Sequence, residues 1–169
     1  MRSVGIITFV CATFVYTVGV VRAQQPVVKG FSSAADIQAM IEKAKNERKP
    51  DQPNFIQPIL QAAPYNVNLE YRVQGIETNP NIHDVEAEIV YVVDGAGVLT
   101  IGGKLKDERR TNDKNRTGSK LEGGTPRRIA KGDYVLIPEN TAHSFTQVEG
   151  RLVIMSVHVP RGGPAGPAN

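Results

Sequence analysis

Two histidines and one glutamate, His83, Glu88 and His143, are the side chains of this sequence best suited to chemistry. The first two lie in the pattern G-x5-N-x-H-x4-E-x6-G over residues 75–95, and the third ends the pattern G-x5-P-x-N-x2-H over residues 132–143. Imidazole nitrogens and carboxylate oxygens are common ligands of divalent transition metals. Two imidazoles and one carboxylate would leave coordination positions open for water or a substrate, so these residue types favour a metal centre.

The spacing within each pattern determines how the side chains can meet. Asn81 and His83 are two residues apart, so both point to one face of an extended chain. Glu88 has the opposite parity, and a turn through residues 84–87 is needed to bring it to that face. The Pro-Glu-Asn segment before His143 predicts a second turn, which lets this histidine enter from a neighbouring strand.

The spacing of both patterns resembles the two signature motifs of the cupin family. The resemblance covers about residues 56–160. It implies an all-β fold, a double-stranded β-helix of the jelly-roll type, in a small single-domain protein. It also implies that a divalent metal is held inside the barrel by the four motif positions, which are Asn81, His83, Glu88 and His143.

The sequence departs from the cupin pattern at three positions. Asn81 stands where a cupin normally has its first histidine, and it could lend a weak carbonyl oxygen or only orient a bound water. Asn140 replaces the usual glycine and Gln147 the usual asparagine, at positions that do not normally bind the metal. The remaining set suits Fe(II) and also accommodates Mn, Zn, Ni or Cu. The alternative is a degenerate pocket in which the histidines are hydrogen-bonded core residues.

Four further residues are candidates for the wall of a substrate pocket: Tyr71, Arg72, Gln147 and His158. The first two lie on a predicted strand that could cross the pocket. The alternative for that strand is a surface salt bridge between Glu70 and Arg72 beside a buried tyrosine. His158, the third histidine, either lines the pocket wall or faces solvent.

The segments that must position these residues are mainly short strands. Residues 66–74 alternate apolar and polar side chains, which predicts a half-buried strand. Residues 89–101 are interrupted by glycines and predict a hairpin. Residues 104–126 are polar and predict a loop insertion. Further strands are expected at residues 128–137, 142–148 and 152–159, and many short strands separated by turns indicate a β-sandwich or barrel.

One helix is expected before the strands, in an N-terminal arm and helix over residues 24–55. Ser33 and Asp36 have the spacing of a capping box. Pro50 ends the helix. One apolar face is formed by Ile37, Met40, Ile41 and Ala44, and we expect this face to pack on the main body or across a subunit boundary.

Residues 1–23 predict a secretory signal peptide, with an apolar stretch over residues 4–21 and Val-Arg-Ala as the cleavage site. An uncleaved membrane anchor is the alternative. The only cysteine, Cys11, lies inside this leader. We therefore expect a periplasmic or secreted protein without disulfides and without stable membrane insertion after cleavage. The Gly/Pro-rich tail, residues 161–169, is predicted to be disordered.

The charge pattern does not support binding to nucleic acid. Removing residues 1–23 takes away two arginines and no acids, so the net charge falls from +3 to +1. Residues 104–131 hold ten basic and four acidic side chains. They lack the interleaved aromatic residues on which bases stack, so a solvated charged surface is the favoured interpretation.

Together these features predict an exported, metal-dependent small cupin that acts on a small organic molecule as a dioxygenase, isomerase or lyase. The fold does not choose among these reactions. The resemblance also makes a homodimer plausible. The alternatives are a non-catalytic binding protein for a sugar or another small ligand, with a degenerate metal site, and a structural partner protein that uses the 104–126 segment as its contact surface.

Overall fold

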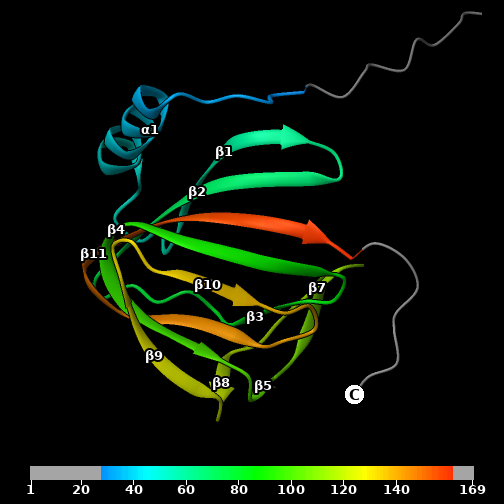
Figure 1. Ribbon diagram of the computed structural model, residues 1–169. Coiled ribbons are helices and arrows are strands. Elements are labelled where there is room, and N and C mark those ends of the chain that lie inside the picture. The colour runs from blue at the N-terminus through cyan, green and yellow to red at the C-terminus, as the bar shows by residue number, and fades with distance from the viewer. Residues whose placement is uncertain (1–27, 162–169) are drawn as a thin grey trace, which may run out of the picture.

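The computed structural model describes residues 28–161 as one helix and eleven strands (Figure 1). The predicted leader lies outside the described residues, as does the tail from residue 162 onward. The elements are α1 Ala34–Glu47, β1 Phe55–Ala62, β2 Tyr65–Val73, β3 Asn81–His83, β4 Glu86–Ile101, β5 Lys104–Lys106, β6 Arg109–Asn112, β7 Asn115–Thr117, β8 Lys120–Glu122, β9 Thr125–Ala130, β10 Tyr134–Ile137 and β11 His143–Pro160.

Two long antiparallel strands, β4 and β11, run through both layers of the molecule. Their pairing extends from Glu86 opposite Pro160 to Ile101 opposite His143. In one layer the strand order is β1-β2-β11-β4-β10, and in the other it is β9-β4-β11-β3-β7-β6. Because both long strands curve from one layer into the other (Figure 1), the two layers close into a double-stranded β-helix of the jelly-roll type. The predicted fold class, all-β with one short N-terminal helix, is confirmed.

The hairpin predicted for residues 89–101 is wrong, because this segment is the continuous strand β4. Gly95 has a φ of +78°, and it provides a bend without reversing the chain. A Cβ atom at this position would lie 1.9 Å from the carbonyl oxygen of Arg151 on β11. Glycine is therefore required here for a close approach of two bent strands rather than for a tight turn.

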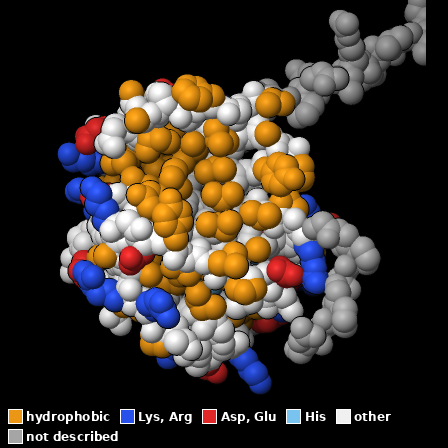
Figure 2. All heavy atoms as spheres, viewed as in Figure 1, with side chains coloured by type: hydrophobic (Ala, Val, Ile, Leu, Met, Phe, Trp, Pro, Cys, Tyr) orange, Lys and Arg blue, Asp and Glu red, His pale blue; other side chains and the backbone are white. Residues whose placement is uncertain are grey.

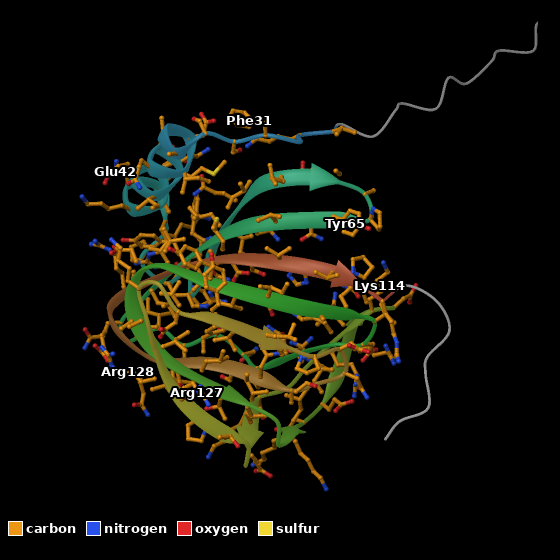
Figure 3. All side chains as sticks on the ribbon, in the orientation of Figure 1. Phe31, Glu42, Tyr65, Lys114, Arg127 and Arg128 are labelled. Carbon is orange, nitrogen blue, oxygen red and sulfur yellow. The ribbon has the colours of Figure 1, made fainter. Side chains whose placement is uncertain are left out.

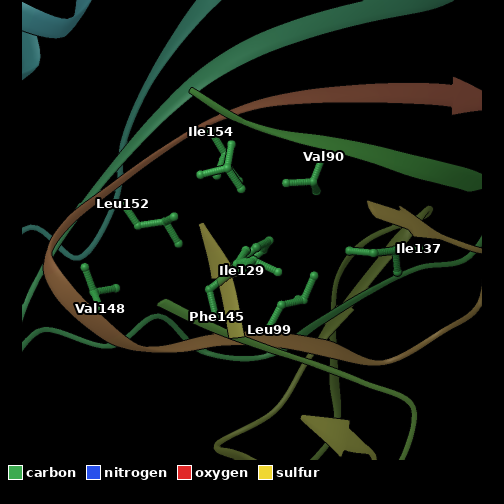
Figure 4. Packing of buried hydrophobic residues seen from close by; sticks show 9 residues of the cluster. Val90, Leu99, Ile129, Ile137, Phe145, Val148, Leu152 and Ile154 are labelled. Atoms are coloured by element: carbon green, nitrogen blue, oxygen red, sulfur yellow. The ribbon is translucent and has the colours of Figure 1, made fainter. Parts of the chain in front are cut away.

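The inner faces of the two layers enclose the main hydrophobic core (Figure 4). The alternation of side chains along β11 points Leu152 and Ile154 inward, and the same alternation along β4 points Val90 and Val92 inward. The other buried members of this core are Leu99, Ile129, Ile137, Phe145 and Val148. These side chains fill one part of the barrel and leave the rest for polar residues.

Helix α1 covers part of the outer face of the first layer, as predicted from its apolar face. Ser33 and Asp36 form the expected capping box, in which the N–H of each residue donates to the side chain of the other. Ala44 packs with Leu69 and Tyr71 of β2 in a second hydrophobic cluster. The helix therefore packs on the main body of the same chain.

The apolar side of β2 thus faces the helix, and its polar side faces the interior of the barrel. Glu70 and Arg72 lie on this inner side and are both buried. The predicted half-buried strand is buried on both faces at residues 69–72, since the helix covers one face and the barrel encloses the other.

The 104–126 segment, predicted to be a polar loop, folds instead into short strands. β5 pairs with β8, and β7 pairs with both β6 and β3, so this segment extends the second layer. Arg116 attaches it to the barrel by donating to Asp84 at 2.6 Å. Figure 3 shows Lys114, between β6 and β7, at the end of the barrel where β11 terminates. Cross-strand pairing, which composition does not reveal, orders this polar sequence.

The part of the outer face that α1 leaves open is apolar. Figure 2 shows hydrophobic side chains gathered over β1, β2, β11, β4 and β10. Tyr134 and Leu136 of β10 are 72% and 59% exposed, and they lie opposite Tyr91 and Ile89 of β4. Among the described residues, the single helix is too short and too polar to cross a membrane.

Candidate metal centre

His83, Glu88 and His143 meet inside the barrel, as the two motifs predicted. One potential ligand atom from each residue lies within 4.8 Å of the other two. Nε2 of His143 is 3.3 Å from Oε2 of Glu88, and Nε2 of His83 is 3.5 Å from the same oxygen. Glu88 and His143 are each only 3% exposed. Two groups of the first motif and a histidine distant in the sequence therefore converge on one buried point.

The local chain geometry explains how they converge. β3 ends at His83, and a bend at residues 84–85 precedes β4. Because of this bend, the side chain of Glu88 points to the same side as that of His83, into the interior between the two layers. His143 is the first residue of β11 and pairs with Asn81 of β3, which places its imidazole beside that of His83.

Both imidazoles turn their Nε2 atoms toward Glu88 because their Nδ1 atoms have other partners. Nδ1 of His83 lies 2.6 Å from Oδ1 of Asn115, and Nδ1 of His143 lies 3.2 Å from the carbonyl oxygen of Thr141. Since both partners are acceptors, Nδ1 carries the proton in each ring. In a neutral ring the Nε2 lone pair would then face the carboxylate. Such second contacts commonly orient metal-binding histidines.

Glu88 is ionised in this environment. Burial raises its pKa, but the contacts with His143 and His83 and the hydrogen bond from Ser156 outweigh burial and hold the pKa well below its usual range. For His83, burial lowers the pKa because it disfavours the charged ring. The contacts with Glu88 and Asn115 outweigh burial, so the pKa of His83 is raised above its usual value. The cluster therefore favours a positive charge between the carboxylate and the rings, which either a proton or a metal ion could supply.

A second group of side chains supports Glu88 from β11. The hydroxyl of Ser156 donates to Oε1 of Glu88 at 2.8 Å and lies 3.1 Å from Nε2 of His158. Nδ1 of His158 is 3.5 Å from Oε2 of Glu86. The ring of His158 also meets the ring of His83 edge-on, with 4.7 Å between their centroids. The third histidine thus belongs to the pocket wall, which was one of its two predicted positions.

Sequence reasoning missed Asn115 and Ser156. Ser156 lies at an ordinary position of a predicted strand, although it shares the inward parity of Ile154 and His158, and that parity was a usable signal. Asn115 lies in the segment that was predicted to be a polar loop. Nothing in its local sequence indicates that it meets His83, which lies 32 residues away.

Three of the other predicted site residues, Asn81, Arg72 and His158, line a pocket of about 170 Å³ together with the three candidate ligands. Asn81 is exposed, and no hydrogen bond joins its side chain to the other described residues of the pocket. Its weak or indirect part in metal binding stays a prediction.

Two predicted pocket residues, Tyr71 and Gln147, are not part of this pocket. Tyr71 has the opposite parity to Arg72 and packs in the cluster beneath α1. Gln147 is exposed and lines a neighbouring surface hollow with Arg128 and Glu149, which meets this pocket at Arg72 and Phe145. Its backbone turns there at a φ of +47°, where the β11 pairing is irregular.

The salt bridge predicted for the surface is buried instead. Nη2 of Arg72 donates to Oε2 of Glu70 at 2.6 Å, and both side chains are almost inaccessible to solvent. A surface salt bridge would require the polar side of β2 to face solvent. Helix α1 instead covers the apolar side of β2, so the polar side faces the interior of the barrel.

Comparison with solved structures identifies the fold. No protein-family profile matches the sequence, and no curated protein matches it either. The BH2720 protein of Bacillus halodurans aligns with a TM-score of 0.53 at 18% identity, over 82% of this chain and 87% of that chain. A protein with a double-stranded β-helix domain from Klebsiella pneumoniae gives 0.51 at 14% identity, over 67% and 82%. The cupin domain of Schizosaccharomyces pombe Cnp3 gives 0.50 at 11%, over 65% and 66%. The chain therefore has the cupin fold.

Proposed function

We propose that this protein binds a divalent transition metal through His83, Glu88 and His143 and acts on a small organic molecule in the adjoining pocket. The observation that carries the proposal is the orientation of the two imidazoles. Both have Nδ1 committed to an oxygen acceptor and Nε2 directed at a buried, ionised carboxylate. Neutral rings would place two lone pairs against a negative charge, and a cation at that point removes the conflict.

The donor set fits the metals expected from the sequence. Two nitrogens and one carboxylate oxygen suit Fe(II) and accommodate Mn, Zn, Ni or Cu. A metal held there would supply Lewis-acid or oxygen-activating chemistry. The chain itself orients Glu88 through Ser156 and orients His83 through Asn115. Dioxygenase, isomerase and lyase reactions all remain compatible with this arrangement.

A non-catalytic ligand-binding protein is the second candidate. It is favoured by one observation, that Asn81 is exposed and forms no hydrogen bond with the three candidate ligands at the position where a cupin normally has a histidine. A site with three protein ligands instead of four would bind metal more weakly. In that case the pocket would hold a small ligand without transforming it.

Export and self-association belong to the same proposal. The predicted leader at residues 1–23 supports a periplasmic or secreted protein. The exposed apolar face over β4 and β10 supports a homodimer, because a face of this kind on a protein surface commonly marks an interface.

Elemental analysis of the purified protein, prepared without a metal-binding tag, tests the metal site. We expect one equivalent of a transition metal per chain in the wild type and loss of most of it in Glu88→Ala. Glu149→Ala is the matched control, because it removes an exposed glutamate outside the pocket, and it should keep the metal.

Two results would contradict the metal site: a wild type that takes up no metal on reconstitution, or full occupancy in Glu88→Ala. Asn81→His gives a further test, because a fourth ligand at this position should tighten metal binding. An unchanged affinity would show that residue 81 lies outside the coordination sphere. Metal-free protein that still binds a small ligand would support the second candidate.

A further inference from the structure

β9 and β10 are edge strands on the same side of β4. β10 pairs with β4 before the bend at Gly95, β9 pairs with it after the bend, and neither has a second partner among the described strands. A groove of about 730 Å³, the β9–β10 groove, is lined by these two strands and by the second half of β4. Among residues 28–161, this groove and the pocket of the candidate metal centre have no lining residue in common.

The inner part of the groove is apolar because the barrel core reaches it. Leu99 and Ile129, two members of the main core, are almost fully buried and lie at its base. Ile101 and Val135 are only half-buried and pack against the same core. A hydrocarbon chain in the groove would remove the exposed part of these side chains from water, which is favourable in proportion to the apolar area buried.

Arg127 adds a positive charge to these apolar surroundings. It lies opposite Leu99 in the pairing of β9 with β4. Residues directly opposite each other in an antiparallel pair share one face of the sheet. Arg127 is therefore on the inner face of β9, two residues before Ile129, and its exposed side chain lines the groove. Figure 3 labels it beside Arg128 on the same strand.

The other charges that line the groove already have partners. Nε and Nη2 of Arg128 donate to the two carboxylate oxygens of Glu149, each at 2.8 Å. Oδ2 of Asp133 accepts from the N–H of Ala130 at 2.8 Å, and the carboxylates of Glu149 and Asp133 raise the pKa of Arg128. Arg127, in contrast, has no ion-pair partner among residues 28–161. An apolar groove with one unpaired cation fits a ligand that combines a hydrocarbon chain with one anionic group.

We propose that the β9–β10 groove binds an anionic amphiphile, a monocarboxylate with a hydrocarbon chain. Arg127 holds the carboxylate through its planar fork of N–H donors, and the chain lies against Ile101 and Val135. The inference goes beyond the proposed function, because the groove contains none of the candidate metal ligands. Tyr134 and Leu136 form the outer rim of the groove, so the site borders the apolar face proposed for the homodimer.

Calorimetric titration of the purified protein with octanoate, butanoate and octanol tests the inference. Octanoate carries both the carboxylate and the chain, and it should bind at one site per protein chain. Butanoate keeps the carboxylate but has half the hydrocarbon chain, so it should bind at least about tenfold more weakly. Octanol keeps the chain without the charge, so it should also bind at least about tenfold more weakly.

Arg127→Gln separates the contribution of the cation from that of the apolar groove. This substitution should weaken octanoate about tenfold, because it removes charge-assisted hydrogen bonds. It should leave octanol unchanged, because the contacts of the chain remain. Arg109→Gln is the matched control, since Arg109 is an exposed arginine of β6 outside the groove, and it should leave the affinities of all three probes unchanged.

The metal content is varied in the same experiment, because a metal ion also attracts a carboxylate. The affinity for octanoate should be equal after removal of metal with EDTA and after loading with Zn²⁺. Binding that occurs only in the loaded protein would assign the carboxylate to the metal centre. That result would overturn the groove site and leave the proposed function intact.

The groove site is also overturned if the wild type does not bind octanoate, or if octanoate and butanoate bind equally well. Wild-type affinity for octanoate in Arg127→Gln would contradict the role of Arg127. Loss of octanoate and octanol together in that variant would contradict it as well, because a carboxylate anchor affects only the charged probe.

Discussion

Glu88 carries a full negative charge inside a β-barrel, where an isolated carboxylate would be strongly destabilising. Its two oxygens have different partners, since Oε1 accepts from Ser156 and Oε2 faces the two imidazoles. The two rings are in turn oriented by Asn115 and by a backbone carbonyl. At the scale of the residue, the candidate site is therefore a carboxylate whose Oε1 is hydrogen-bonded to the protein and whose Oε2 is available to a cation.

Asn115→Ala should weaken metal binding about 10- to 100-fold, the usual effect of losing a contact that orients a ligand. Without Oδ1 of Asn115, the Nδ1 proton of His83 loses its acceptor and the ring is free to rotate or change tautomer. Competition with a chromophoric chelator measures the affinity. Asn112→Ala is the control, because its side chain caps the backbone N–H of Lys114 in the same hairpin without reaching His83. Equal affinities in the two variants would exclude this role for Asn115.

At the scale of the element, the bends of β4 and β11 create the barrel. Each of these strands runs through both layers, so its bend determines the angle at which the inner faces of the two layers pack. The bend at Gly95 combines a positive φ with contact to the β11 backbone. The strand that carries Glu88 therefore depends on a residue seven positions away for its path.

Gly95→Ala should lower the free energy of unfolding by roughly 3 kcal/mol. The positive φ costs about 1–2 kcal/mol for an alanine, and the overlap with Arg151 adds about 1–3 kcal/mol. Gly75→Ala provides the comparison, because Gly75 has a φ of +81° and a Cβ atom added to it would meet no other atom within 4 Å. Gly75→Ala should lose only the free energy that the positive φ costs. Urea denaturation of both variants measures the difference, and equal losses would show that the β11 contact is unimportant.

The capping box of α1 predicts a dependence of stability on pH. Hydrogen bonds from the N–H and hydroxyl of Ser33 lower the pKa of Asp36 below its usual value of 3.8. A group whose pKa is lowered on folding stabilises the protein above its unfolded pKa, and this contribution is lost as the pH falls through the folded pKa. Urea denaturation should therefore show Asp36→Ala less stable than the wild type at pH 7.

That difference should shrink as the pH falls below about 4, because the wild-type carboxyl becomes protonated as well. Asp51→Ala, which changes an exposed aspartate beyond the helix, controls for the loss of a surface charge. A gap between the wild type and Asp36→Ala that stays constant down to pH 2 would contradict the capping contribution of this carboxylate.

At the scale of the whole molecule, the barrel is divided between an apolar core and a polar pocket, and its outer sheet face is divided between a covered and an open part. Helix α1 covers the region around Leu69 and Val153, while Tyr134 and Leu136 remain exposed on the same face. The rings of Tyr91 and Tyr134 lie against each other, tilted by 34° with 4.5 Å between their centroids, which extends the apolar surface across β4 and β10.

Leu136→Asp should convert the proposed homodimer into monomers, since a charge at the centre of an apolar interface is unfavourable. Sedimentation velocity measures the change, and metal content should stay the same because Leu136 points away from the barrel interior. Ile56→Asp is the control, as Ile56 is also exposed but lies on the other face of the sheet, beside the pocket. A monomeric wild type would rule out this assembly.

Local signals in the sequence were sufficient for several features. The helix from Ser33, its capping box and its apolar face depend on residues at most four positions apart, and all were predicted correctly. The motif spacing likewise predicted the cupin fold and the convergence of His83, Glu88 and His143. These predictions succeeded because each depends on short-range geometry or on a spacing characteristic of a known fold.

Other features were decided only by the tertiary structure. Asn115 meets His83 across 32 residues and Ser156 meets Glu88 across 68 residues, so no local pattern connects them. The alternation of β2 separated polar from apolar side chains but did not say which side faces inward. The position of α1 on the apolar side decided that Glu70 and Arg72 are enclosed. Alternation determines that a strand has two different faces, whereas the packing of distant elements determines which face is inside.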